Sequence, residues 1–293
     1  MKERSIYAIA GYVATLPALL LVVILLLFPM LQNLYYSFTS WDALTNPVWV
    51  GLENYKELFS DPNFLLSFRN TIIWVIATLV FPVFGGLLIA SFIRDLKGEE
   101  IFKSIIFFPL AISFVSTGII WINMFASNSG VLNGLLSLLS GRVIKVQWLA
   151  EAPRNTYSMI VAWTWQQTGT NMVLFLMGLT SIPRDPVEAA LIDGANKWQT
   201  FRFVTVPMLR PITTVVIAQA LVNSFKTFDL IYVITRGGPY RSTETLAVTM
   251  YRESFTMFRL GYGAAISVVL SFIIILISGF YVRKQMGKEQ LYY

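Results

Sequence analysis

Two groups of polar side chains recur at helical spacing inside apolar segments, and they are the residues best suited to contact a ligand. The 293-residue chain has no cysteine and no histidine, which excludes thiol nucleophiles and histidine bases. The first group, at i, i+3, i+4 and i+7, consists of Trp163, Gln166, Gln167 and Thr170. The second consists of Asn223, Ser224 and Thr227, with the charged Lys226 and Asp229 beside them. Amides and hydroxyls can exchange hydrogen bonds with sugar hydroxyls, and an indole can cover a pyranose ring.

The same groups have a second interpretation, as hydrogen-bonding contacts between packed helices. Lys226 also has two interpretations: it reaches toward the membrane interface while paired with Asp229, or it contacts the substrate. In the second case an anionic sugar or a sugar phosphate becomes the better candidate.

The composition of the chain is that of a membrane protein. Of its residues 56% are hydrophobic and 13% are charged, and the mean hydropathy is +0.64. The net charge of +6 comes from Lys and Arg that lie mainly at the edges of apolar runs, where such residues orient membrane helices. Nucleic-acid binding is therefore disfavoured.

Six segments are long and apolar enough to cross a bilayer, which takes about 20 residues per helix. The predicted spans are residues 6–38, 69–93, 104–126, 156–181, 211–235 and 260–282. The first begins with charges like a signal peptide, but no small-residue cleavage site follows it, so we expect a retained span. The fifth is free of charged residues only over 211–225. It is long enough to cross the bilayer only if the membrane-spanning helix continues through Lys226 and Asp229, which would lie three positions apart on it.

The distribution of basic residues predicts cytoplasmic termini. The segments on the side of the termini hold 12 Lys and Arg, whereas the longer opposite loops hold nine. One opposite loop, residues 39–68, contains an amphipathic stretch at 51–59 that predicts a short interfacial helix. We expect one all-α transmembrane domain over residues 1–293.

A polar loop at residues 182–210 carries strong helix signals. Asp185 is a candidate N-cap with Glu188 three residues later, and Gly194 suits a left-handed C-terminal turn. A second short helix is predicted over 197–204, before Pro207. Helices this short need something to pack against. The loop is either a hairpin packed on its own bundle or a helix that inserts into a groove of a cytoplasmic partner.

Four stretches resemble permease subunits of ATP-binding-cassette importers. "EAALIDGA" followed by "VTVPMLRP" resembles the EAA loop of that family. "VGLENYKELFSDPNF" with "RNT", "FDLIYVITRGGPYRSTETL" and "GYGAAISVVLSF" resemble its carbohydrate-uptake branch, in particular the first subunits of maltose and glycerol-phosphate permeases. Arg236 departs from the pattern, where a third glycine is usual.

The resemblance implies a six-helix type I importer (MetI-like) permease fold, a sugar substrate and several partners. These partners are a second permease subunit, two ATPase subunits that carry the ATP and Mg, and an extracytoplasmic solute-binding protein. The coupling helix that docks on the ATPase would involve Asp185, Glu188, Ala189, Ala190, Asp193, Gly194, Ala195 and Pro207. The outer loop facing the binding protein would involve Gly237, Gly238 and Pro239. The chain itself has no phosphate-binding loop motif, so no cofactor is expected on it.

Three other classes of protein remain to be weighed against an importer. A secondary transporter or channel would use an ion gradient, but the sequence shows no inverted repeat and no acidic relay within the spans. A membrane-embedded enzyme lacks a catalytic constellation. A permease of the same family for another solute is disfavoured by the carbohydrate-type strings.

Overall fold

The computed structural model describes residues 15–94, 96–225 and 227–289. The chain divides into two compact units, one formed by residues 1–61 with 250–269 and the other by residues 62–249 with 270–293. The start of the predicted first span, residues 6–14, and Lys226 lie outside the described residues.

The smaller unit begins with the apolar helix Thr15–Tyr36, which contains the π-turn η1 (Val23–Leu27) and ends as α2 (Phe28–Tyr36). Strands β1 (Thr39–Ser40) and β2 (Val48–Trp49) form a small hairpin, and α3 (Glu53–Ser60) is the helix predicted near 51–59. Asn54 Nδ2 donates to the carbonyls of Ser37 and Thr39 at 2.9 Å each. The unit also holds η4 (Arg252–Thr256) and the first turns of α15 (Leu260–Glu289).

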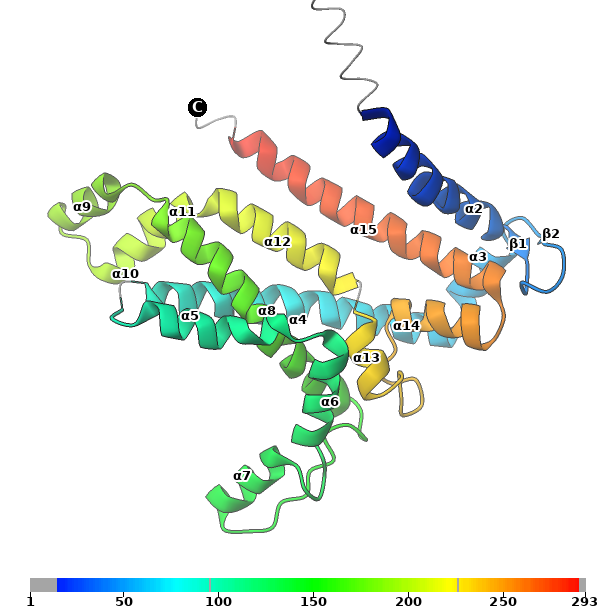
Figure 1. Ribbon diagram of the computed structural model, residues 1–293, viewed down its shortest axis with the longest axis horizontal. Coiled ribbons are helices and arrows are strands. Elements are labelled where there is room, and N and C mark those ends of the chain that lie inside the picture. The colour runs from blue at the N-terminus through cyan, green and yellow to red at the C-terminus, as the bar shows by residue number, and fades with distance from the viewer. Residues whose placement is uncertain (1–14, 95, 226, 290–293) are drawn as a thin grey trace, which may run out of the picture. The chain divides into compact units, whose positions relative to one another are not determined.

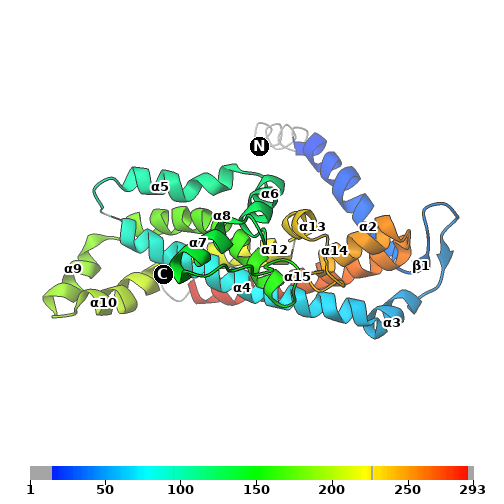
Figure 2. The same ribbon diagram turned by 90° about the horizontal axis from the view of Figure 1, so that it is seen from below.

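The larger unit is a bundle around one long central helix, α8 (Figures 1 and 2). Its elements are α4 (Pro62–Ile93), α5 (Glu99–Phe107), η2 (Phe108–Ala111), α6 (Phe114–Met124), α7 (Val131–Ser140), α8 (Arg154–Thr180), α9 (Arg184–Ile192), α10 (Lys197–Thr200), η3 (Phe201–Thr205), α11 (Val206–Met208), α12 (Arg210–Phe225), α13 (Asp229–Ile234) and α14 (Leu246–Tyr251), together with the rest of α15.

Only some of the predicted spans are single straight helices. Thr15–Tyr36, Pro62–Ile93 and Leu260–Lys284 are long and apolar enough to cross a membrane. The predicted third span is bent by 101° between η2 and α6, where Pro109 opens the 3₁₀ turn and Ser113 caps the next helix. With each bent pair counted as one span, the described residues contain up to five candidates.

The predicted fifth span, 211–235, is wrong as one continuous helix. It ends at Phe225, where the apolar run stops, and a separate helix starts at Asp229. On its other side it is bent by 69° from the preceding helix Lys197–Met208. Residues 227 and 228 are not helical, and Asp229 is exposed at the start of α13.

Helix α8 packs against α4, α5 and α12 and divides the larger unit into layers. Gly86 lets α4 approach α8 closely, because a Cβ there would lie 2.6 Å from Cβ of Asn171. An aromatic layer is centred on Trp74, Trp121 and Trp163. An aliphatic layer contains Val83, Ala90, Ile93, Met172, Phe175, Leu176, Leu179, Ile182, Leu209 and Val216. The polar residues of the unit that matter for function lie between these layers.

Candidate functional site

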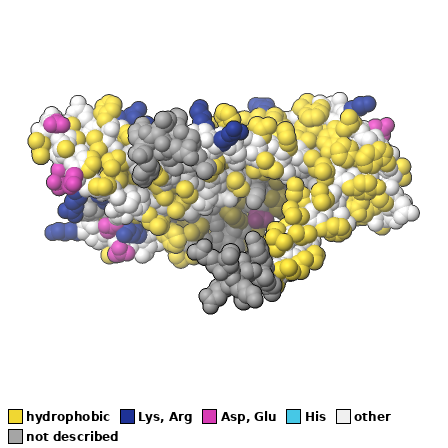
Figure 3. Space-filling view, turned by 90° about the horizontal axis from the view of Figure 1, so that it is seen from above, with side chains coloured by type: hydrophobic (Ala, Val, Ile, Leu, Met, Phe, Trp, Pro, Cys, Tyr) yellow, Lys and Arg dark blue, Asp and Glu magenta, His cyan; other side chains and the backbone are white. Residues whose placement is uncertain are grey.

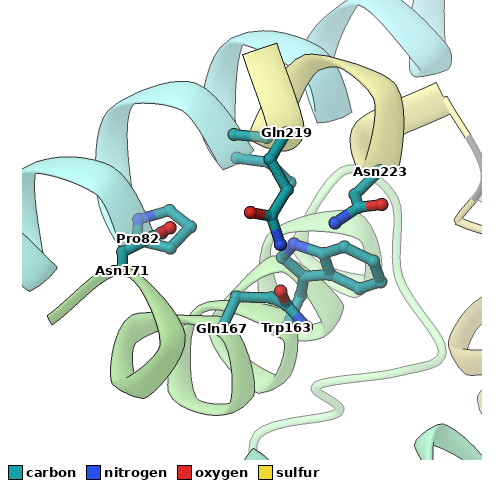
Figure 4. A pocket seen from close by; sticks show the side chains of 8 residues that line it. Pro82, Trp163, Gln167, Asn171, Gln219 and Asn223 are labelled. Carbon is teal, nitrogen blue, oxygen red and sulfur yellow. The ribbon is translucent and has the colours of Figure 1, made fainter. Parts of the chain in front are cut away.

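A small polar cavity lies between the two apolar layers of the larger unit (Figure 4). Helix α4 contributes Thr78 and Pro82, α8 contributes Trp163, Gln167 and Asn171, and α12 contributes Gln219, Ala220 and Asn223. Its free volume of about 10 Å³ is room for about one water molecule. The cavity is partly open, since Gln219 is exposed while Trp163 and Asn171 are buried, and in this conformation it has no room for a larger ligand.

The order of residues along each lining helix explains the position of the cavity. On α4 the cavity residues 78–82 precede the aliphatic-layer residues 83–93, and on α8 the cavity residues 163–171 precede 172–179. On α12 the order is reversed, because Val216 of the aliphatic layer comes before the cavity residues Gln219 and Asn223. The side chains of α4, α8 and α12 thus change from aliphatic to polar where the three helices line the cavity.

The structure brings together three of the predicted ligand-contacting residues. Trp163, Gln167 and Asn223 line the cavity, and the Gln219 side chain reaches from α12 toward Trp163 (Figure 4). The indole of Trp163 is fixed from behind, because it stacks on Phe114 at 4.9 Å and meets Trp74 edge to face at 6.0 Å. The indole of Trp163 therefore forms a fixed aromatic wall beside the carboxamides of Gln167, Gln219 and Asn223.

The other described residues of the two predicted groups do not line the cavity. Gln166 is buried, and its Nε2 donates to the carbonyl of Ile112 at 2.7 Å, so it fixes the bend after η2. Ser224 donates to the carbonyl of Leu221 at 2.7 Å, and Thr227 donates to Ser224 at 3.3 Å. Thr170 and the exposed Asp229 are not among the lining residues. Among Gln166, Ser224 and Thr227, only Gln166 bonds to another segment, as the helix-contact interpretation expects, whereas Ser224 and Thr227 bond to carbonyls of their own segment.

Four polar or special lining residues were missed in the sequence. Asn171 lies four positions after Gln167, and Gln219 lies four positions before Asn223, so each extends a predicted stripe by one turn. Thr78 and Pro82 lie on α4, where Ser67, Asn70 and Thr71 precede Thr78 on one buried face. Because Pro82 has no N–H, the carbonyl of Thr78 lacks its usual intrahelical donor beside the cavity.

The polar loop, residues 182–210 and here called the coupling loop, begins differently from the prediction. Helix α9 starts at Arg184 with Pro183 as its N-cap, so Asp185 lies in the first turn and is not the cap. Pro183 takes the N-cap place because the helix extends two residues further toward the N-terminus than predicted. The capping box occurs at the next helix, where Asn196 and Gln199 exchange hydrogen bonds.

The C-terminal end of α9 confirms the prediction for Gly194. Its φ is +86°, and its N–H donates to Leu191 while the N–H of Ala195 donates to Ala190. This is the Schellman arrangement, in which a left-handed residue satisfies the last carbonyls of a helix. The N–H of Asp193 donates to Ala189, and Pro207 lies in the first turn of α11.

The coupling loop is anchored at its base and exposes apolar side chains at its far end. Ile182 and Leu209 belong to the aliphatic layer, and Val187 packs against that layer. In contrast, Ile192 is 85% exposed, Trp198 68% and Phe203 71%. Charged side chains gather at the same end (Figure 3). Glu188 lines a hollow beside α9 together with Arg94 and Arg184. The base of the loop therefore packs on the larger unit, while its far end leaves these apolar side chains exposed.

A second loop, residues 235–245 and here called the Gly-Gly-Pro loop, has a polar interior. Glu244 is fully buried, and its Oε2 accepts hydrogen bonds from Arg241 Nε and Thr249 Oγ1, both at 3.0 Å. Asn70 Nδ2 donates to the carbonyls of Ser242 and Glu244 at 2.9 Å. Gly237 has a φ of +87°, and a Cβ there would collide with Glu244. Tyr240, next to Pro239, is 99% exposed with a φ of +50°.

The described residues combine helices that are long and apolar enough to cross a membrane, a small polar cavity in the larger unit, and a loop with exposed apolar side chains. Residues 83–286 match the family described as the binding-protein-dependent transport system inner membrane component. The chain belongs to this family of transporter permeases, and it is a transport subunit of the inner membrane, not an enzyme.

Relatives of similar length agree with this assignment. A probable ABC transporter permease of Pyrococcus horikoshii is 38% identical over 87% of this chain and 88% of its own. The osmoprotective compounds uptake permease of Synechocystis is 36% identical, covering 94% and 98%. The multiple sugar-binding transport system permease of Streptococcus mutans is 35% identical, covering 92% of each chain.

Solved structures confirm the predicted type I importer permease fold. A crystal structure of a bacterial ABC transporter that imports the acidic polysaccharide alginate aligns with a TM-score of 0.84 over 95% of both chains, at 21% identity. The same kind of transporter in complex with an alginate pentasaccharide-bound periplasmic protein also gives 0.84, at 20% identity.

Proposed function

We propose that this chain is a membrane-spanning permease subunit of an ATP-driven importer that moves a sugar delivered by an extracytoplasmic binding protein. The observation that carries the proposal is that the coupling loop joins the two helices, α8 and α12, that hold most of the cavity side chains. Motion imposed on this loop by a partner would move both walls of the cavity.

A sugar is the substrate class that suits the cavity. Its described lining offers carboxamides on Gln167, Asn171, Gln219 and Asn223, and the indole of Trp163. Carboxamides donate and accept at once, as hydroxyl-rich ligands require, and the indole provides an apolar stacking surface. The names of relatives that carry sugars support this class. A di- or oligosaccharide needs more room than the present cavity has, so α8 and α12 must separate during transport.

We assign ATPase docking to the coupling loop. Exposed large apolar side chains on a loop that also carries charges are typical of a protein-binding surface. Ile192, Trp198 and Phe203 supply the apolar contacts, while Asp185, Glu188 and Asp193 supply charge. ATP and Mg would bind the partner ATPase, and this chain would bind neither.

The other partners in the proposal are a second homologous permease, two ATPase subunits and the binding protein. The Gly-Gly-Pro loop, with Gly237, Gly238 and Pro239, faces the binding protein in this arrangement, and Tyr240 is its most exposed side chain. Six membrane crossings would place both termini in the cytoplasm. Lys226 belongs to the proposed pathway only as a sequence prediction.

The proposal is tested by uptake of radiolabelled sugars in cells that carry Gln167→Ala or Asn223→Ala. Each change removes about one hydrogen bond, worth about 1 kcal/mol, so the apparent KM should rise about five-fold with normal assembly. Gln147→Ala, at an exposed position away from the cavity, is the matched control. Unchanged kinetics in both variants would favour a helix-contact role. Uptake that persists without ATP hydrolysis but collapses with the ion gradient would favour a secondary transporter.

A further inference from the structure

Helix α7 turns its polar face inward. Asn133 is 3% exposed, and its Nδ2 donates to the carbonyls of Ser127 at 2.9 Å and Val146 at 3.0 Å. Its Oδ1 accepts from Trp148 Nε1 at 2.9 Å. One turn later Ser137 Oγ accepts from the N–H of Ile144 at 2.8 Å. The segment after α7 therefore satisfies the polar side of the helix, and water is not needed there.

The opposite face of α7 is apolar and exposed. Val131 and Leu135 are about half exposed, Leu138 is 79% and Leu139 84% exposed, and Val143 in the following turn is 82% exposed. The four helical residues recur at i, i+4, i+7 and i+8, so they form one continuous stripe, and Val143 follows beyond the end of the helix. An amphipathic helix of a water-soluble surface has the reverse orientation, because exposed apolar area is unfavourable in water.

Charge beside the stripe indicates what covers it. Arg142 and Lys145 are exposed in the turn that follows α7, and the sequence contains no acidic residue from 127 to 150. An aliphatic stripe with a basic border complements a bilayer surface, where acyl chains lie below negatively charged phosphates. Protein-binding hot spots are instead enriched in Trp, Tyr and Arg and contain few Leu or Val. With 10 residues, α7 is too short to span the membrane.

We propose that α7 is an interfacial anchor that lies flat on the bilayer, with its leucine stripe in the acyl region and Arg142 and Lys145 at the phosphates. The proposal requires only that the chain resides in a membrane, and it is independent of the substrate. Figure 1 shows α7 beyond the end of α6, to one side of α8.

The anchor is connected to the aromatic wall of the cavity. Leu132 of α7 and Trp148 of the following segment pack against the aromatic layer that contains Trp163. Helix α6, which leads into α7, packs on α13, where a Cβ on Gly118 would lie 2.7 Å from Val233 Cγ1. An anchor at this place holds the Trp163 end of α8 at a fixed depth in the membrane, so that α12 moves relative to it.

The test uses single cysteines, which the chain allows because it has none of its own. Leu139→Cys and Val143→Cys are labelled with a nitroxide in the assembled transporter, reconstituted in nanodiscs of phosphatidylcholine and phosphatidylglycerol. Gln147→Cys, an exposed polar position in the same loop, is the matched control. Oxygen concentrates among acyl chains, whereas the nickel chelate stays in water. We expect the labels at 139 and 143 to collide more often with oxygen than with the chelate, and the label at 147 to collide more often with the chelate.

Three results would overturn the proposal. Dominant collision with the nickel chelate at 139 would show that the stripe faces water. Low collision with both reagents would show that it is covered by protein, such as the second permease. In the double variant Arg142→Gln with Lys145→Gln, we expect the ratio of oxygen collisions to nickel collisions at 139 to fall. An unchanged ratio would show that the two basic residues do not hold the helix at the phosphates. None of these readouts requires transport, so they remain informative if the sugar-import proposal fails.

Discussion

The coupling loop and the Gly-Gly-Pro loop both belong to the larger unit, but different interactions stabilise their conformations. The coupling loop relies on backbone caps at Gly194 and Asn196 and exposes Ile192 and Trp198. The Gly-Gly-Pro loop is built around a carboxylate, Glu244, that is entirely removed from solvent. Capped helices with an exposed apolar face keep their binding surface available, whereas a buried ion pair with several hydrogen bonds fixes one conformation.

The two loops differ in how firmly they are attached to the rest of the larger unit. In the coupling loop, only the base is anchored, by Ile182 and Leu209. In the Gly-Gly-Pro loop, Asn70 from α4 and Asn155 from α8 both bond to Ser242, at 2.9 and 2.8 Å. We expect the first to respond to a partner and the second to resist deformation.

The largest effect should come from Glu244→Ala, which would abolish the buried carboxylate of the Gly-Gly-Pro loop. Breaking a buried ion pair costs about 3–5 kcal/mol, since Arg241 would lose its partner at 3.0 Å, so the melting temperature of the purified subunit in detergent should drop clearly.

Glu151→Ala is the matched control, because the Glu151–Arg154 pair has the same 3.0 Å distance and i,i+3 spacing but both side chains are about half exposed. An exposed pair of this kind contributes at most about 1 kcal/mol. Equal losses in the two variants would contradict the assignment of a buried, shape-determining role to Glu244.

An intermediate effect is expected from Ile192→Asp in the coupling loop. Removing an apolar contact at the centre of an interface costs about 2 kcal/mol or more, so ATPase copurification should weaken about 30-fold. The subunit itself should keep its melting temperature, because this side chain is 85% exposed. Leu44→Asp, at a position that is 86% exposed in the other unit, should leave copurification unchanged. A loss of stability in place of binding would show that the coupling loop is packed on its own bundle after all.

The smallest effect should come from Gly194→Ala. The added methyl group meets nothing within 4 Å, so the cost is only the left-handed backbone at φ +86°, about 1–2 kcal/mol. We expect sugar-stimulated ATP hydrolysis to fall several-fold. Gly141→Ala carries the same kind of strain, at φ +65° and also in open space, and should leave the coupled activity intact. Similar losses in both variants would mean that general stability, not the coupling loop, sets the activity.

Much of this architecture was predictable from the sequence, because its signals are local. Hydropathy located the long helices, and Gly194 marked the end of α9 through its tolerance of positive φ. The break near Ile112 was not predictable, because apolar length alone does not distinguish a continuous span from two short helices, whereas the break before Asp229 falls where the charge-free run 211–225 ends. Helical spacing found Trp163, Gln167 and Asn223, but Thr78 and Pro82 depend on how α4 packs against α8, which is a tertiary property.

The aliphatic layer between the cavity and the coupling loop has an evolutionary consequence. Met172, Phe175 and Leu179 occupy the turns of α8 between Asn171 and the loop, so a changed side chain in the cavity does not touch the exposed surface around Ile192. Under the proposed function, substitutions that alter the substrate cavity and substitutions that alter the ATPase-binding surface therefore fall on separate parts of the chain. In that arrangement a duplicated gene acquires a new substrate while its product still binds the same ATPase.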